Sequence, residues 1–458
     1  MENLGGEKQD LSLRALLILA WPIVLARSSQ AVITFADALM IAPLGENAVA
    51  AVTTGGVNVF TLMVFPIGVV MIVQSFAAQL HTKGDHSAAR RFGYYGLLVA
   101  LISMGFGFVL VPFLEPLLSV FPYDAPVRVA MIDYLSIRLL GLGVLVGVEA
   151  LGGWYGGLGI TRLHMQAGLI SMVLNVLLNA LLIEGRFGFP ALGVIGAAWA
   201  SLIASALGFA FILLFFAKGW ALEATARVAA GQLRLAEWWR MLRFGIPNGL
   251  NFFLELAAFA IFINVVVADL GTSALAAMMV VFSVNSVSFM PAFGLSTAGA
   301  ILTGQAIGAE RKDEVPSVMY RTLAVTVTWQ VAVGLSYLLA PAVIIGWFAP
   351  PDEGPSLVVI GTTMLSLSAA WQFFDAVAIV VGEALRAAGD TAWSMWARVV
   401  AAWVVFMPAA FYFVTYSNGG PVAAIGCVIL YLSVLSIALY MRFQTGAWRR
   451  IDLTGLNL

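Results

Sequence analysis

Apolar runs long enough to cross a membrane follow one another along almost the whole chain. Twelve such runs begin near residues 14, 48, 93, 128, 164, 191, 243, 273, 320, 357, 393 and 421. A helix of about 20 apolar residues crosses the hydrocarbon core of a bilayer. Hydrophobic residues make up 61% of the 458 residues and charged residues 10%, whereas soluble domains are about a quarter charged. The sequence therefore predicts an all-α polytopic membrane protein with twelve transmembrane helices.

The chain also repeats itself after about 226 residues. The segment LGENAVAAV at 44–52 matches LGTSALAAM at 270–278, and GGLGIT at 156–161 matches RAAGDT at 386–391. We therefore expect two pseudo-symmetric six-helix lobes, residues 1–217 and 241–458. Each lobe holds an even number of spans, so both should run in the same direction through the membrane, as in some transporters.

Between these lobes lies the only long polar stretch, KGWALEATARVAAGQLRLAEWWR, at residues 218–240. We expect it to be a cytoplasmic linker that contains an interfacial amphipathic helix, with Trp238 and Trp239 at the level of the lipid headgroups.

The positive charges predict the orientation. All but four of the 23 Lys and Arg residues fall at the termini, loops or helix ends of one side of the membrane. Two of the four, Arg128 and Arg186, fall on the other side, and Arg27 and Arg138 lie within spans. Positive charge accumulates on the cytoplasmic side of membrane proteins, so both termini are predicted to be cytoplasmic. The polar N-terminus does not resemble a removable signal peptide, and we expect the first span to be retained.

Three acidic residues lie inside otherwise apolar stretches: Asp37, Glu255 and Asp375. A carboxylate at the centre of a bilayer costs about 3 kcal/mol on insertion scales, and such residues usually mark ion or proton pathways. The alternative is that one or more of them is a structural partner for a neighbouring helix. Taken together, the three acids indicate that the protein handles ions or protons inside the membrane.

Other motifs exclude several classes of protein. The single cysteine, Cys427, cannot form a disulfide framework or a cysteine-based metal site. The chain has no phosphate-binding loop and no HExxH motif. The three histidines lie in or beside inside loops and are predicted to be solvated: His81, His86 and His164. We therefore expect neither an enzyme nor a nucleic-acid-binding protein.

Several segments, in this order, resemble the multidrug and toxic compound extrusion (MATE) transporters, and in particular their NorM-like branch. These segments are LAWPIVLARSSQAVITFADALMIAPLGENAVAAV from residue 19, YLSIRLLGLG from 134, LGITRLHMQAGLISMVLNVLLNALLIEG from 158, and GEALRAAGDT from 382. The resemblance covers about residues 12 to 445 and implies a MATE-type fold. It also implies a location in the plasma membrane, here the bacterial inner membrane.

The resemblance also implies which residues handle the coupling cation. It assigns this role to Asp37, Glu255 and Asp375, with Asn175 and Asn179 as polar partners on one span and Ser201 on the next. Asn175 and Asn179 are four residues apart and share a helix face, and their oxygens suit a hard cation. A Na⁺ ion is expected at Glu255 and Asp375, or at Asp37, Asn175 and Asn179. Other branches carry a carboxylate at the position of Asn179, which weakens the case for Na⁺ there. The two Asn residues could instead join neighbouring helices, and Ser201 could permit close helix packing.

Two arginines within spans are harder to assign from the sequence. Arg138 is expected to form a structural ion pair with Asp133 or Glu149. Arg27 is ten residues before Asp37, about 15 Å along a helix, so we expect it either to line a cavity or to pair with another carboxylate. The substrate cavity is predicted to involve Arg27, Asp37, Glu255 and Asp375.

The sequence therefore predicts an antiporter, coupled to Na⁺ or H⁺, that exports organic, often cationic or amphipathic compounds by alternating access. No cofactor is expected besides the coupling ion, and the protein is expected to act as a monomer in the lipid bilayer on small drug-like molecules. A flippase for lipid-linked oligosaccharides from the same superfamily is the alternative. It would require several basic residues in the central spans to hold a pyrophosphate, and only Arg27 and Arg138 are present there.

Overall fold

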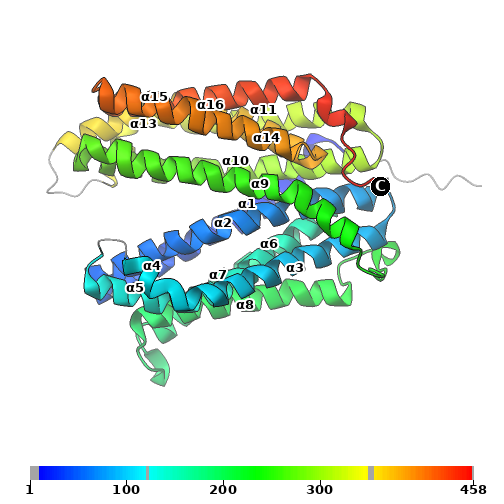
Figure 1. Ribbon diagram of the computed structural model, residues 1–458, viewed down its shortest axis with the longest axis horizontal. Helices are drawn as coiled ribbons and strands as arrows, with labels where there is room; N and C mark the ends of the chain where they lie inside the picture. The colour runs from blue at the N-terminus through cyan, green and yellow to red at the C-terminus, as the bar shows by residue number, and fades with distance from the viewer. Residues whose placement is uncertain (1–9, 120–122, 349–354, 456–458) are drawn as a thin grey trace, which may run out of the picture. The chain divides into compact units, whose positions relative to one another are not determined.

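The computed structural model describes residues 10–119, 123–348 and 355–455 (Figure 1). The first nine residues, which carry part of the predicted retained N-terminus, lie outside this range. Within the described residues every regular element is a helix. Twelve of these helical segments are long and apolar enough to cross a membrane, which confirms the number of spans predicted from the apolar runs.

The described α-helices are numbered along the chain. Those of the first half are α1 (Leu13–Ile41), α2 (Glu46–Thr82), α3 (His86–Leu110), α4 (Leu114–Ser119), α5 (Ala125–Arg138), α6 (Leu142–Gly157), α7 (Arg162–Leu182) and α8 (Gly193–Lys218). Those of the second half are α9 (Leu235–Ile261), α10 (Thr272–Gly308), α11 (Val315–Leu339), α12 (Pro341–Gly346), α13 (Pro355–Ala388), α14 (Thr391–Val399), α15 (Met407–Ala410) and α16 (Gly420–Gln444).

Short 3-10 and π-helical segments extend or connect these helices. The 3-10 segments are η1 (Ala42–Leu44), η2 (Val111–Phe113), η3 (Leu139–Gly141), η4 (Arg186–Gly188), η5 (Ala224–Ala226), η7 (Ala268–Leu270), η8 (Lys312–Glu314) and η11 (Ala447–Arg450). The π-helical segments are η6 (Phe262–Val267), η9 (Val400–Phe406) and η10 (Phe411–Tyr416). Pro408 lies between η9 and η10, where its missing N–H interrupts the α-helical hydrogen-bond ladder.

Contacts divide the chain into two compact units. Unit 1 comprises residues 1–21, 78–84 and 257–458, of which the described part begins at Asp10, and unit 2 comprises residues 22–77 and 85–256. In unit 1, α13 packs against α10, α11 and α16; in unit 2, α6 packs against α3 and α8, and α7 packs along α8. The division falls within α1, α2 and α9.

The internal repeat is visible in local geometry. α2 and α10 have 37 residues each, and both follow a 3-10 turn and a glycine. Gly45 has φ 100° and ψ 170°, and Gly271 has φ 94° and ψ 169°. Glycine alone adopts this region without strain. Gly159 and Gly389, in the second pair of matching segments, likewise have φ values of 86° and 89°. The matching sequences therefore form matching turns.

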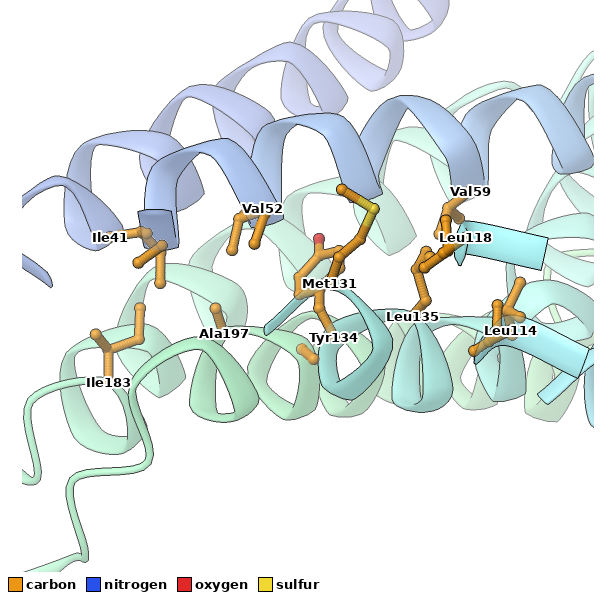
Figure 2. Packing of buried hydrophobic residues seen from close by; sticks show 14 of the residues in the cluster. Ile41, Val52, Val59, Leu114, Leu118, Met131, Tyr134, Leu135, Ile183 and Ala197 are labelled. Atoms are coloured by element: carbon orange, nitrogen blue, oxygen red, sulfur yellow. The ribbon is translucent and has the colours of Figure 1, made fainter. Parts of the chain in front are cut away.

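Apolar packing at one end of unit 2 holds α2 to α4 and α5. Figure 2 shows this cluster, in which Met131, Tyr134 and Leu135 of α5 lie beside α2. A Cβ atom on Gly55 of α2 would lie 2.8 Å from the Tyr134 ring, so the glycine makes room for that ring. Such close contacts matter because helices in a bilayer associate mainly through packing and polar contacts, since lipid tails are as apolar as the side chains.

The predicted linker is held against α3 in unit 2. Between residues 218 and 240 the only helical pieces are η5 and the beginning of α9 at Leu235, so Trp238 and Trp239 belong to a long helix and not to a separate amphipathic one. Glu237 is buried and accepts two hydrogen bonds of 2.7 Å from Arg91 and one of 2.9 Å from Tyr95. A buried charge requires such pairing.

Candidate cation-binding sites

Four polar side chains from three helices meet inside unit 2. Asp37 lies on α1, Asn175 and Asn179 on successive turns of α7, and Ser201 on α8. Asp37 is 6% exposed and both asparagines are 0% exposed. The structure thus brings together the four residues that the sequence grouped. We refer to them as the Asp37 cluster.

Every hydrogen bond to the Asp37 carboxylate in this cluster is donated by a neutral group. Asn175 Nδ2 and Asn179 Nδ2 lie 3.1 and 2.6 Å from Oδ1, and Ser201 Oγ lies 3.0 Å from Oδ2. Asn179 Nδ2 also lies 3.2 Å from Asn175 Oδ1, and Asn175 Nδ2 lies 3.0 Å from Ser201 Oγ. The Asp37 carboxylate therefore joins α1 to α7 and α8.

One oxygen of this cluster has no hydrogen-bond partner within the described residues. It is Asn179 Oδ1, which is buried. A buried polar atom without a partner costs about 1–3 kcal/mol. Carboxylate, amide and hydroxyl oxygens are the ligands that hard cations accept, and the Asp37 cluster contains all three kinds. The cluster therefore has both the charge and the oxygen atoms for a small cation.

Arg27, which the sequence left open, pairs with a carboxylate. Its two terminal nitrogens lie 2.9 Å from the two oxygens of Glu149 on α6, a bidentate arrangement that is stronger than a single contact. His164 Nε2 lies 3.7 Å from Glu149 Oε1. The side chains of all three are less than 20% exposed. The prediction that His164 is solvated is therefore wrong, because the residue turns inward from the start of α7.

Arg138 does not form the expected ion pair. In the described part of the chain neither Asp133 nor Glu149 pairs with it: Glu149 pairs with Arg27, and Asp133, five residues earlier on α5, lies on a different face of that helix. The Arg138 guanidinium instead lies 5.9 Å from the centre of the Tyr134 ring, where the face of the ring attracts a cation.

In unit 1, Asp375 of α13 lies at the end of a network of amides and hydroxyls. Gln330 Nε2 of α11 donates to Asp375 Oδ2 over 3.0 Å. Ser288 of α10 donates to Gln330 Oε1 and lies 3.3 Å from Gln372 Oε1. Gln372 donates to Asn285 Oδ1, which also accepts from the Trp371 indole over 3.1 Å. We call these residues the amide network.

The amide network was not predicted from the sequence. Its members, Gln330, Ser288, Gln372 and Asn285, are polar residues in mainly apolar runs such as TVTWQVAV and VNSVSF. The available signal was the presence of amides at membrane depth, because such groups need partners there. From the sequence, partners were expected for the three acids and for Asn175 and Asn179, and the same rule extends to these amides.

The third acid, Glu255, is half-buried on α9. By its contacts it belongs to unit 2, whereas Asp375 belongs to unit 1. A joint role for the two acids therefore stays a prediction.

Comparison with known proteins agrees with this architecture. The family model MatE matches residues 22–181 and 247–412. The chain belongs to the MatE family. It is 27% identical over 448 residues to the probable multidrug resistance protein NorM of Pseudomonas putida, covering 97% of this chain and 96% of that protein. It is 26% identical over 407 residues to the corresponding protein of Thermotoga maritima, covering 86% and 85%. The resemblance to the NorM-like branch is thereby confirmed.

Solved structures show the same fold. One described as an outward-facing multidrug resistance MATE family transporter of the MOP superfamily superposes with a TM-score of 0.85 at 18% identity, covering 97% of this chain and 100% of that one. A MOP superfamily transporter from Pyrococcus furiosus gives a TM-score of 0.84 at 18% identity, with the same coverage. The MATE-type fold predicted from the sequence is confirmed. The twelve apolar helices and the bacterial relatives support a multi-pass protein of the inner membrane.

Proposed function

We propose that this MatE family protein is a cation-coupled antiporter that exports organic, often cationic or amphipathic compounds by alternating access. The observation that carries the proposal is the Asp37 cluster, a buried carboxylate with three neutral donors and a spare amide oxygen. The names of the bacterial relatives support multidrug efflux as the direction of transport. The protein is proposed to be a transporter and not an enzyme, and to act as a monomer.

The coupling ion is Na⁺ or H⁺, and either would act at the acids of the two units. A positive charge that moves inward down a 100 mV potential releases about 2.3 kcal/mol. A cation can drive export only if it binds one lobe arrangement more tightly than the other, and the substrate must favour the opposite one. The coupling acids in this proposal are Asp37 and Glu255 in unit 2 and Asp375 in unit 1.

A flippase for lipid-linked oligosaccharides fits the described residues less well. Such a substrate carries a pyrophosphate, which needs uncompensated positive charge inside the membrane. The charge of Arg27 is balanced by Glu149, and Arg138 lies over an aromatic ring. The acids at Asp37 and Asp375 would repel the phosphates. The relatives are also named for multidrug resistance.

Transport by purified protein in liposomes would test the proposal. With a fluorescent organic cation as the substrate, an imposed Na⁺ gradient or an imposed pH gradient should drive its movement against its own gradient. The gradient that succeeds identifies the coupling ion. Movement that ignores both gradients would contradict coupling, and no movement of any organic cation would contradict the proposed export.

Orientation needs its own test. Both termini are proposed to be cytoplasmic, so Lys83→Cys and Lys312→Cys should react only with thiol reagents that enter the cell. These positions follow α2 and α10, the matching helices of the repeat. The single native cysteine, Cys427, is buried, and it provides the background signal. Labelling of either new cysteine from outside intact cells would reverse the topology.

A further inference from the structure

The amide network beside Asp375 has one hydrogen-bond donor fewer than its amide oxygens require. Its members are buried or half-buried, and Gln330, Ser288 and Gln372 are each at most 2% exposed. In so buried a site the donors and acceptors of the network are expected to satisfy one another. Counting them shows which orientations of the amides are allowed.

At the Trp371 end of the network the direction of each hydrogen bond is fixed. An indole N–H can donate but cannot accept, so the atom of Asn285 that faces Trp371 is the oxygen. Asn285 Nδ2 donates to Val281 O over 2.8 Å and lies 3.4 Å from Ser368 Oγ. Because Asn285 presents its oxygen, Gln372 must present its Nε2 group to it. Gln372 Oε1 therefore faces Ser288.

At Ser288 two acceptor oxygens meet a single hydroxyl hydrogen. Gln330 donates its amide nitrogen to Asp375, so its own Oε1 faces Ser288 as well. The hydroxyl lies against Gln330 Oε1, and Gln372 Oε1 is 3.3 Å away. A hydroxyl has one hydrogen to donate, so one of the two amide oxygens lacks a donor from this network whenever Asp375 acts as an acceptor.

We propose that Gln330 reverses its side-chain amide when Asp375 takes up a cation, and that this reversal completes the network. The inference rests on the proposed coupling role of Asp375. After reversal Gln330 Oε1 faces Asp375, and Gln330 Nε2 donates to Ser288 Oγ. The Ser288 hydroxyl then donates to Gln372 Oε1. Each amide oxygen of the network then either accepts a hydrogen bond or contacts the cation.

Both coupling ions fit the same reversal. A proton would reside on Asp375 Oδ2 and be donated to Gln330 Oε1, which is an ordinary hydrogen bond. A Na⁺ ion would be held by the carboxylate and by Gln330 Oε1 as a second oxygen ligand. Reversal of a terminal amide exchanges nitrogen and oxygen at nearly fixed positions. The switch therefore needs no movement of α10, α11 or α13.

Ser288 is a positioning residue in this scheme, because its hydroxyl donates to Gln330 in one state and to Gln372 in the other. The variant Ser288→Ala removes the advantage of the cation-bound state, because both orientations of Gln330 then leave the same number of atoms without partners. Since one hydrogen bond contributes about 1 kcal/mol, the cation affinity should fall about fivefold. The variant Gln330→Leu removes the ligand oxygen and should lower the affinity further.

Equilibrium cation binding and infrared difference spectra of the purified full-length protein test the inference. Radioactive Na⁺ binding at fixed pH and proton uptake in Na⁺-free buffer form the two arms. Addition of the coupling cation should shift a side-chain amide carbonyl band in the wild type, and this shift should be absent in Gln330→Leu. Thr326→Val is the matched control, because Thr326 is buried one turn earlier on α11 and lies outside the network. Its affinity and band shift should equal those of the wild type.

The outcomes separate this inference from the function on which it rests. If Asp375→Asn binds the cation as the wild type does, the proposed role of Asp375 fails. If Asp375→Asn loses binding while Ser288→Ala keeps the wild-type affinity, the inference alone fails. An unchanged amide band shift in Gln330→Leu overturns it too. The inference is supported if Ser288→Ala lowers the affinity for Na⁺ or for protons, while its melting temperature stays normal and Thr326→Val binds the cation as the wild type does.

Discussion

The carboxylates of the two units are surrounded by similar groups in different arrangements. Asp37 in unit 2 accepts directly from two amides and a hydroxyl, and the whole cluster is buried. Asp375 in unit 1 is half-buried and receives an amide hydrogen from Gln330, behind which a second layer of amides lies. Three hydrogen bonds from its own cluster hold Asp37, whereas the amide network reaches Asp375 through Gln330, whose amide we propose to be reversible.

The two halves of the repeat also carry different side chains on corresponding helices. By order in the repeat, α9, α14 to η10, and α16 correspond to α1, α7 and α8. In unit 1, η6, which continues α9, together with η9 and α16 holds aromatic rings where unit 2 holds the Asp37 cluster: the ring centres of Phe262 and Phe406 are 4.9 Å apart, and those of Phe406 and Tyr431 are 5.4 Å apart. Duplication thus kept the helices but not the chemistry, so the two acids are not copies of each other and can do different work.

The largest expected effect comes from removing each acid in turn. Asp37→Asn, Asp375→Asn and Glu255→Gln should each reduce gradient-driven export to background, because the substitutions keep the size of the side chain and remove its ionisable group. Efflux in liposomes under the successful gradient measures this. If Asp37→Asn alone loses export, while Asp375→Asn and Glu255→Gln keep it, coupling belongs to unit 2 and the comparison reduces to one functional and one structural site.

The next largest effect is expected from adding a carboxylate to unit 2. In Asn179→Asp the new carboxylate would stand where Nδ2 now lies, 2.6 Å from Asp37 Oδ1. Two carboxylates so close cannot both ionise unless a cation lies between them. The variant should therefore be tolerated, and its cation affinity should rise by about tenfold or more. Equilibrium Na⁺ and proton binding would detect this. An unchanged affinity would show that the cation does not enter the Asp37 cluster.

The fold and the Asp37 cluster could be predicted from sequence because their signals are local or repeated. Apolar run lengths gave the twelve spans, and the spacing of four residues placed Asn175 and Asn179 on one helix face. The partner of Arg27 could not be predicted. Glu149 is 122 residues away from it, and Arg138 lies nearer to Glu149 in the sequence and was a chemically reasonable partner for that carboxylate. Ion pairs between distant helices depend on which helices pack together, and this is decided by the whole fold.

The amide network escaped prediction for a related reason. Gln330 and Ser288 are 42 residues apart, and Gln330 and Asp375 are 45 apart. Helical spacing within one of these runs does not show which residues of another run it meets. Only the packing of α10, α11 and α13 brings these side chains together. His164 was misjudged because its position near a loop said nothing about the direction in which its ring turns.

Replacing the acid by a neutral amide should lower the free energy of unfolding by different amounts at the two sites. In Asp37→Asn an NH₂ group replaces one of the two oxygens that accept hydrogen bonds from Asn175, Asn179 and Ser201. At least one of these donors then loses its acceptor, so the free energy of unfolding should fall by about 1–3 kcal/mol. Asp375→Asn should cost less than about 1 kcal/mol, because the Gln330 amide can turn to accept from it. Asp269→Asn, at an exposed position on η7, is the control and should stay within about 0.5 kcal/mol of the wild type. Thermal unfolding in detergent without coupling cation measures all three; equal costs at positions 37 and 375 would contradict the difference drawn between direct and adjustable contacts.

The smallest expected effect concerns coupling within the Asp37 cluster. Asn175 and Asn179 share the same acceptor, Asp37 Oδ1, and also contact each other over 3.2 Å. Groups in one network fail additivity, so the combined effect of Asn175→Ala and Asn179→Ala on cation binding should differ from the sum of the single effects by about 1 kcal/mol. Combining either with Asp37→Asn should show the same failure of additivity.

Asn175→Ala with Gln330→Ala is the matched control, because in the described part of the chain these two residues share no partner. Their effects on cation binding should add within about 0.5 kcal/mol. Strict additivity in the Asn175 and Asn179 pair would mean that the cluster is only a packing contact, and it would leave Glu255 and Asp375 as the coupling acids.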